Sequence, residues 1–189
     1  TMKLYPQPAA RLTAWAAVPD LASAVTLLGL AHQHLGAGLT GFEVMGQFAL
    51  SLVAKHFPQQ RVPLWEDTPY CVLLENSDSE SEAHARERFE RLLETAFEQG
   101  AVSDAVVAES LQQAHALWHI RESIPLAQAE EGLNIKHDIS LPVSAIPDFV
   151  ARTDAALQAA YPGVRLVNFG HLGDGNLHYN VQAPQGTDG

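Results

Sequence analysis

The chain has 189 residues, of which 47% are hydrophobic, and a formal charge of −11 with its nine histidines counted as neutral. This length and apolar content are enough for one packed domain and argue against disorder. The charge argues against nucleic acid or an anionic membrane surface as a partner, because both require clustered Lys and Arg side chains. An anionic ligand would therefore have to be held by a few local cations.

The sequence also limits where the protein works. Its single cysteine, Cys71, lies in the apolar run 70–74, so no disulfide can form within the chain and a reducing compartment is favoured. No apolar run approaches the roughly 18 residues of a membrane span, and the first residues lack the apolar core of a signal peptide. We therefore expect a cytoplasmic location, with a peripheral membrane association of the full-length protein left open.

Strand and helix signals alternate along the chain. Short apolar runs predict strands, and apolar stripes at helical spacing predict helices. The expected strands are 13–18, 39–45, 70–75, 103–107, 135–141, 164–169 and 177–181, and the expected helices are 21–35, 46–57, 79–99, 109–124 and 144–160. The third helix would start from a capping box with Ser79 as N-cap and Glu82 reaching back. Pro125 would kink or restart the fourth helix.

This order of elements predicts an α+β fold. We expect an antiparallel sheet with helices on one face, built from duplicated ferredoxin-like units. A doubly wound parallel sheet is the alternative. No Gly-rich phosphate loop follows a strand, so the sequence predicts no nucleotide site within this chain.

The segment His171–His178 is a candidate metal site. Its two imidazoles flank Gly-Asp-Gly-Asn, a sequence typical of a tight β connection. If the chain folds back there, His171 pairs with His178 across a hairpin, close enough to share one metal ion. Asn180 would point the same way as His178. Two histidines are too few for a catalytic zinc site, so a third ligand must come from elsewhere, and a hairpin without metal is the simpler alternative.

Two cations could hold an acidic ligand. The guanidinium of Arg121 matches a carboxylate in two hydrogen bonds, although the segment by itself favours a surface Arg beside an acidic neighbour. Strand alternation places Lys136 and Asp138 on one face, either as a surface ion pair or with Lys136 as a second cation. The sequence has no Gly-x-Ser-x-Gly elbow and no nucleophilic cysteine signature, so hydrolysis by such a nucleophile is poorly supported.

The candidate residues belong to three motifs that follow one another along the chain. They are Trp-x-x-Arg-Glu at 118–122, Lys-x-Asp-x-Ser-x-Pro at 136–142, and Phe-Gly-His-Leu-Gly-Asp-Gly-Asn-Leu-His-Tyr-Asn at 169–180. With these motifs the chain resembles the C-terminal, substrate-side domain of the FAD-linked D-2-hydroxyacid dehydrogenases. This group of the vanillyl-alcohol-oxidase flavoprotein superfamily includes D-lactate, D-2-hydroxyglutarate and glycolate dehydrogenases. Segments 3–6 and 41–45 add to the resemblance, which covers nearly the whole chain.

The resemblance implies roles for particular residues. His171 and His178 would be ligands of a divalent metal, zinc in the family's better-studied members, and Arg121 and Lys136 would hold the substrate carboxylate. Asn180 would lie near the substrate and the flavin. The metal would polarise the 2-hydroxyl, a base would take its proton, and the C2 hydride would pass to FAD. Reduced FAD would then pass electrons to a quinone, a cytochrome or an electron-transfer flavoprotein.

The resemblance also implies parts that this sequence does not contain. Residues 1–12 would be the linker from a preceding FAD-binding domain, and 13–189 would be the substrate domain, truncated at its C-terminus. A Glu-His-Gly motif with the third metal ligand and the base would lie beyond Gly189, so no catalytic base is assigned here. Pro125 stands where some members have a hydroxyl residue that touches substrate. We expect this polypeptide alone to bind FAD poorly and to be inactive.

Two other functions remain open at this point. The chain could be a stand-alone α+β module that binds a metal or a small ligand without redox chemistry. It could also be a structural or dimerising ferredoxin-like domain without a ligand. A structure in which His171 and His178 face apart would favour this last possibility.

Overall fold

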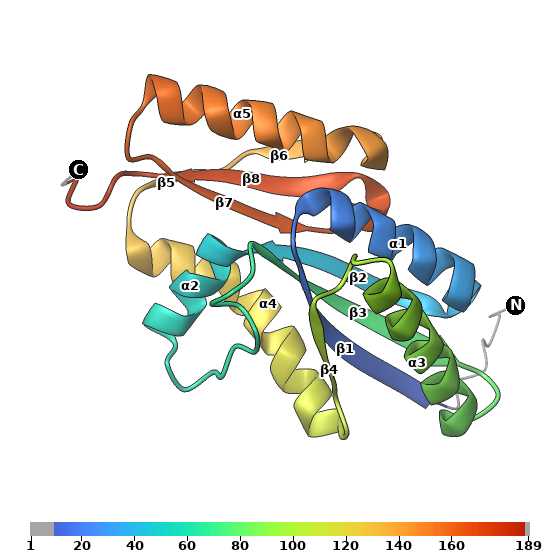
Figure 1. Cartoon of the computed structure of the whole chain (residues 1–189). Coiled ribbons are helices and arrows are strands. Elements are labelled where there is room, and N and C mark those ends of the chain that lie inside the picture. Colours follow the sequence, from blue (N-terminus) through green and yellow to red (C-terminus); the bar gives the residue numbers. More distant parts are fainter. Residues whose placement is uncertain (1–9, 188–189) are drawn as a thin grey trace, which may run out of the picture.

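A computed structural model describes residues 10–187 of the chain (Figure 1). Strands and helices alternate as the sequence predicts. In chain order they are β1 (Ala10–Val18), α1 (Leu21–Leu35), the short 3₁₀ helix η1 (Gly36–Gly38), β2 (Leu39–Gly46), α2 (Gln47–His56), β3 (Tyr70–Asp78), α3 (Glu82–Glu98), β4 (Asp104–Val107), α4 (Leu111–Glu131), β5 (Asn134–Ile135), β6 (Asp138–Ser140), η2 (Val143–Ala145), α5 (Ile146–Ala160), β7 (Arg165–Gly170), η3 (Leu172–Asp174) and β8 (Asn176–Gln182).

The described strands form one antiparallel sheet in the order β4-β1-β3-β2-β7-β8-β5, and β6 also pairs with β8. The first four strands have the order of a ferredoxin-like unit, with α1 and α3 as its two helices. The second unit, β6-α5-β7-β8, repeats the order of the first three strands. The units join where β2 pairs with β7, through Val44 opposite Gly170 and Met45 opposite Phe169. The predicted α+β fold with an antiparallel sheet and duplicated units is therefore confirmed.

The expectation of helices on one face only is wrong, because helices cover both faces of the sheet (Figure 1). One core packs the sheet against α1, α3 and α5, and a second packs it against α2 and α4. Strand β1 explains why: Ala14 and Ala16 belong to the first core, whereas Trp15 between them is fully buried in the second. Residues 14–18 of β1 are all apolar, so this part of the strand must be covered on both sides.

Two helix boundaries differ from the predicted ones for local reasons. The N-cap of α3 is Ser81 rather than Ser79, because β3 continues to Asp78 and its carboxylate accepts a hydrogen bond from Glu80 N at 2.7 Å. Helix α4 runs through Pro125 to Glu131 instead of ending before it. The helix hydrogen bond that proline cannot donate is the one to the carbonyl of Arg121.

The structure also differs from the bounds predicted for the linker and for the strand 135–141. Residues 1–9 of the expected linker, with the segment 3–6, lie outside the described residues, whereas residues 10–12 already form the start of β1. The strand expected at 135–141 is two short strands, β5 and β6, which pair with β8 in one continuous register. None of the described helices is long and apolar enough to cross a membrane.

A buried carboxylate fastens the second helical layer to the sheet. The side chain of Glu131 on α4 is only 5% exposed, and it accepts hydrogen bonds from Lys55 Nζ at 2.8 Å, His56 Nε2 at 2.6 Å and Arg165 Nη1 at 2.5 Å. Burial by itself raises the pKa of Glu131, but these three hydrogen bonds outweigh it and lower the pKa to about 2. Glu131 therefore links α2, α4 and β7 as a carboxylate.

We predict that Glu131→Gln lowers the free energy of unfolding by about 2 kcal/mol at pH 7, since charge-assisted hydrogen bonds are lost. Because the pKa of Glu131 falls on folding, the difference from wild type should be full above pH 4.5 and should shrink as the pH drops toward 2. Urea unfolding across this range measures it. Glu130→Gln, one residue away and exposed, is the control, and equal stability of all three proteins would contradict the prediction.

Candidate functional site

The two motif histidines do not face each other across a hairpin as expected. In the ladder of β7 and β8, His178 lies opposite Phe169, and their rings are 4.7 Å apart. His171 lies in a longer connection that contains η3, whose carbonyl and amide groups bond within the loop. The predicted pairing of His171 with His178 was wrong because the chain forms the helical turn η3 over Leu172–Asp174 instead of folding back tightly over Gly173–Asn176.

The two histidines nevertheless come together on one surface. Both line a depression of about 360 Å³ at the end of the β7–β8 connection, together with Asp138, Ile139, Ser140, Asn176 and Leu177. Asp138 Oδ1 lies 2.6 Å from His178 Nδ1, and Glu43 Oε1 lies 2.7 Å from His171 Nδ1. A carboxylate can only accept, so Nδ1 of each ring is the donor and Nε2 is left for a ligand.

Arg121 belongs to the same cluster. Its Nε donates to Glu43 Oε2 at 2.9 Å, and its guanidinium lies over the ring of Phe169, 4.8 Å from the centroid. Phe169 in turn contacts the His178 ring. Glu43 and Phe169 therefore connect the predicted carboxylate-binding Arg121 with both predicted metal ligands.

Lys136, between β5 and β6, and Asn180, on β8, flank this cluster. The register of β8 with β5 and β6 places Lys136 beside Asn180, on the same face as Asp138 and His178. Lys136 is exposed, but Asn180 is only 3% exposed. The amide of Asn180 donates to Gln128 Oε1 and accepts from the backbone N of His137. Asn180 thus fixes the backbone next to Lys136.

The donor set is compatible with part of a metal site. Two imidazoles, each oriented by a carboxylate, line one depression, which is the usual arrangement of zinc-bound histidines. Within residues 10–187, no group of three or more His, Cys, Asp or Glu side chains is arranged to hold a metal ion. A further ligand from beyond Gly189, which the family resemblance implies, stays a prediction.

Sequence reasoning did not assign Glu43 to the site. The available signal was a single acidic residue inside the otherwise apolar segment 42–45 of a strand buried on both faces. A charge in such a place requires partners. The roles of Phe169 and Asp138 were likewise missed, because both depend on which strands are neighbours.

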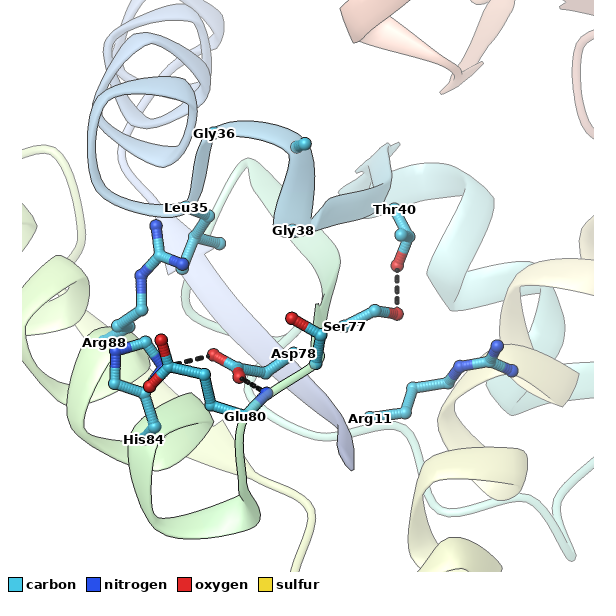
Figure 2. A pocket seen from close by; sticks show the side chains of 12 residues that line it. Arg11, Leu35, Gly36, Gly38, Thr40, Ser77, Asp78, Glu80, His84 and Arg88 are labelled. Carbon is cyan, nitrogen blue, oxygen red and sulfur yellow. Dashed lines mark hydrogen bonds and ion pairs between the residues drawn. The ribbon is translucent and has the colours of Figure 1, made fainter. Parts of the chain in front are cut away.

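A larger depression, of about 720 Å³, lies elsewhere and contains none of the predicted site residues (Figure 2). It is formed by the start of β1, η1, the end of β3 and the start of α3. Several of its polar groups have partners: Asp78 Oδ2 lies 2.6 Å from His84 Nδ1, and Arg88 donates to the backbone carbonyl of His34.

Comparison with known proteins defines the class. Residues 7–189 match the family described as FAD linked oxidases, C-terminal domain, and the chain belongs to that family. A solved alkyldihydroxyacetonephosphate synthase aligns with a TM-score of 0.64 over 98% of this chain and 39% of its own, at 11% identity, which shows the shared fold.

The curated relatives are more specific. A D-2-hydroxyglutarate dehydrogenase of Xanthomonas citri pv. viticola is 44% identical over 151 residues, 79% of this chain and 30% of that protein. A mitochondrial D-2-hydroxyglutarate dehydrogenase of Arabidopsis thaliana is 35% identical over 175 residues, 93% of this chain and 31% of that protein. The resemblance to FAD-linked D-2-hydroxyacid dehydrogenases is confirmed, and the chain spans about a third of the length of these relatives.

The conformation of the loop that carries His171 depends on Gly175. We predict that the substitution Gly175→Ala destabilises the protein. Gly175 has a φ of +70°, and an added Cβ would lie 2.1 Å from the carbonyl oxygen of Leu141. Strain and overlap together should cost about 2–4 kcal/mol in urea unfolding. Gly173→Ala is the control, since its Cβ would meet only Leu28 Cδ1 at 3.8 Å. Equal losses in the two variants would contradict the prediction.

Proposed function

We propose that the full-length protein is an FAD-dependent dehydrogenase that oxidises a D-2-hydroxy acid to the 2-oxo acid, and that this chain supplies its substrate- and metal-binding part. Family membership and the names of the curated relatives support the reaction class. The observation that carries the proposal is the cluster in which Glu43 and Phe169 hold Arg121 beside the two motif histidines.

In this proposal Arg121 binds the substrate carboxylate. Its Nε is engaged by Glu43, so both terminal Nη groups remain for a pair of parallel hydrogen bonds. Lys136 adds a second positive charge from the neighbouring strand. In a chain with a net charge of −11, these local cations are what would retain an anion.

The metal and the flavin complete the proposal. A divalent metal, which we propose to be zinc, would be held by Nε2 of His171 and His178 and would polarise the substrate's 2-hydroxyl, while FAD would accept the C2 hydride. FAD would be held mainly by another part of the protein, with Asn180 near it. A quinone, a cytochrome or an electron-transfer flavoprotein would reoxidise the flavin. The cytoplasmic location of the protein stays a prediction.

The direct test is expression of the full-length protein. We expect bound flavin and reduction of a dye with at least one of D-lactate, D-2-hydroxyglutarate and glycolate, whereas the 189-residue polypeptide alone should be colourless and inactive. A colourless full-length protein that is inactive with every 2-hydroxy acid would refute the proposal. Zinc binding by such a flavin-free protein would instead favour a stand-alone metal-binding module.

We predict that Arg121→Ala mainly raises KM in the full-length enzyme. Loss of charge-assisted hydrogen bonds to a carboxylate should raise it about 10- to 100-fold, with a smaller effect on kcat. Steady-state kinetics measure both constants. Arg152→Ala removes an exposed Arg that pairs only with Asp148 on its own helix and is the control. Unchanged constants in Arg121→Ala would make the carboxylate assignment wrong.

We predict that His171→Ala and His178→Ala each lower kcat about 100-fold or more, because the loss of one imidazole weakens the hold on the metal that polarises the 2-hydroxyl. Zinc content and kcat should fall together in both variants. His115→Ala, an exposed histidine on α4, is the control. Full activity in a variant with reduced zinc content would contradict the proposed role of the metal in the reaction.

A further inference from the structure

The carboxylate of Glu43 is a buried charge of the site to which the proposed function assigns no role beyond its contact with Arg121. Its side chain is 3% exposed and lies in β2, where the adjoining residues Phe42 and Val44 are core residues. Burial of a carboxylate is costly unless it is paired and hydrogen-bonded. Glu43 meets this condition with both oxygens, and the two partners come from different parts of the fold.

One oxygen of Glu43 orients His171. The His171 ring is itself 61% exposed, so packing alone does not fix its orientation, whereas Glu43 Oε1 lies 2.7 Å from its Nδ1. Because the carboxylate accepts, it keeps the proton of a neutral His171 on Nδ1 and leaves the lone pair on Nε2. Only a nitrogen with a free lone pair can bind a metal ion.

The other oxygen orients Arg121. Glu43 Oε2 accepts from Arg121 Nε at 2.9 Å, and Cζ of the guanidinium lies over the ring of Phe169. These two contacts fix the plane of the guanidinium. Within residues 10–187 neither Nη1 nor Nη2 makes a hydrogen bond, and their edge is the one that forms two parallel hydrogen bonds with a carboxylate.

We propose that Glu43 is a positioning residue that holds the metal ligand His171 and the carboxylate-binding Arg121 in one fixed arrangement, so that a 2-hydroxy acid meets both at once. The inference rests on the proposed function. In this inference one buried side chain sets the distance between two binding positions. One position holds the carboxylate of the substrate, and the other holds its 2-hydroxyl. An error in that distance is costly in catalysis, because reacting groups must be held in near-attack geometry.

The variant Glu43→Gln distinguishes this role from simple burial. Glutamine keeps the size, but it offers one acceptor and one donor in place of two acceptors. If its oxygen faces Arg121, its NH₂ group faces His171 Nδ1 and favours the tautomer with the proton on Nε2, where a metal would bind. If it is flipped, its NH₂ group faces Arg121 Nε and the guanidinium loses its anchor. Both contacts cannot survive together, and a population of the two arrangements weakens both.

The experiment uses the full-length protein and measures two affinities separately. Zinc affinity is measured by competition with a chelator. Carboxylate affinity is measured as the inhibition constant of propionate and of glutarate, which carry carboxylates but no 2-oxygen and so do not need the metal. Glu43→Gln should weaken zinc binding about 10- to 100-fold and should also raise the inhibition constant about tenfold. Circular dichroism and flavin content confirm that the variant is folded.

Three further variants are compared with Glu43→Gln in the same two affinity measurements. His171→Ala should weaken zinc binding alone, and Arg121→Ala should weaken carboxylate binding alone. Glu122→Gln makes the same charge change on an exposed side chain next to Arg121 and should alter neither. A Glu43→Gln protein in which either affinity equals that of wild type would overturn the inference. A wild-type protein without zinc binding or 2-hydroxy acid turnover would refute the proposed function itself.

A second measurement does not depend on whether the variant folds. In zinc-free wild-type protein, nitrogen-15 spectra should place the proton of neutral His171 on Nδ1, since the Glu43 carboxylate can only accept. A wild-type proton on Nε2 would overturn the inference.

Discussion

The pairing of β2 with β7 joins the two halves of the sheet, and the site depends on it. In the described part of the chain, the ladder at this junction pairs Val44 with Gly170 and Met45 with Phe169. It nevertheless brings Glu43, one residue before Val44, beside His171, one residue after Gly170. Gly170 has a φ of +149°, and its Cα lies so close to β8 that an added Cβ would be 3.2 Å from the carbonyl oxygen of Asn176. The junction thus places a buried charge at the base of an exposed loop.

The charges on this face follow from the same arrangement. Glu43 is buried and needs donors, and α4 supplies Arg121 while the β7–β8 loop supplies His171. A second carboxylate, Glu131, fastens the end of α4 to α2 and β7 through three cationic or polar partners. Helix α4 is therefore held against the sheet at two points by buried acids, and Arg121 lies at one of them. The position of the guanidinium is thereby linked to the packing of a whole helical layer.

Much of the local structure was predictable, because it depends on neighbours in sequence. Helix α1 and most strand centres follow from apolar periodicity, Asp20 and Gly36 mark the ends of α1, and the motifs identify the family. The errors have physical causes as well. Ser81 rather than Ser79 is the N-cap of α3, because the Asp78 carboxylate accepts a hydrogen bond from Glu80 N. The hairpin prediction was wrong because the loop contains a helical turn.

The sequence by itself determined the α+β class, the family, and the candidate residues Arg121, Lys136, His171, His178 and Asn180, because residue type and spacing carry that information. Only the tertiary structure decided which of them share one cluster, that helices cover both faces of the sheet, and that Glu43 connects Arg121 with His171. The physical reason is the separation along the chain. Glu43 lies 78 residues before Arg121, and no periodicity in a sequence records which distant strand will satisfy a buried charge.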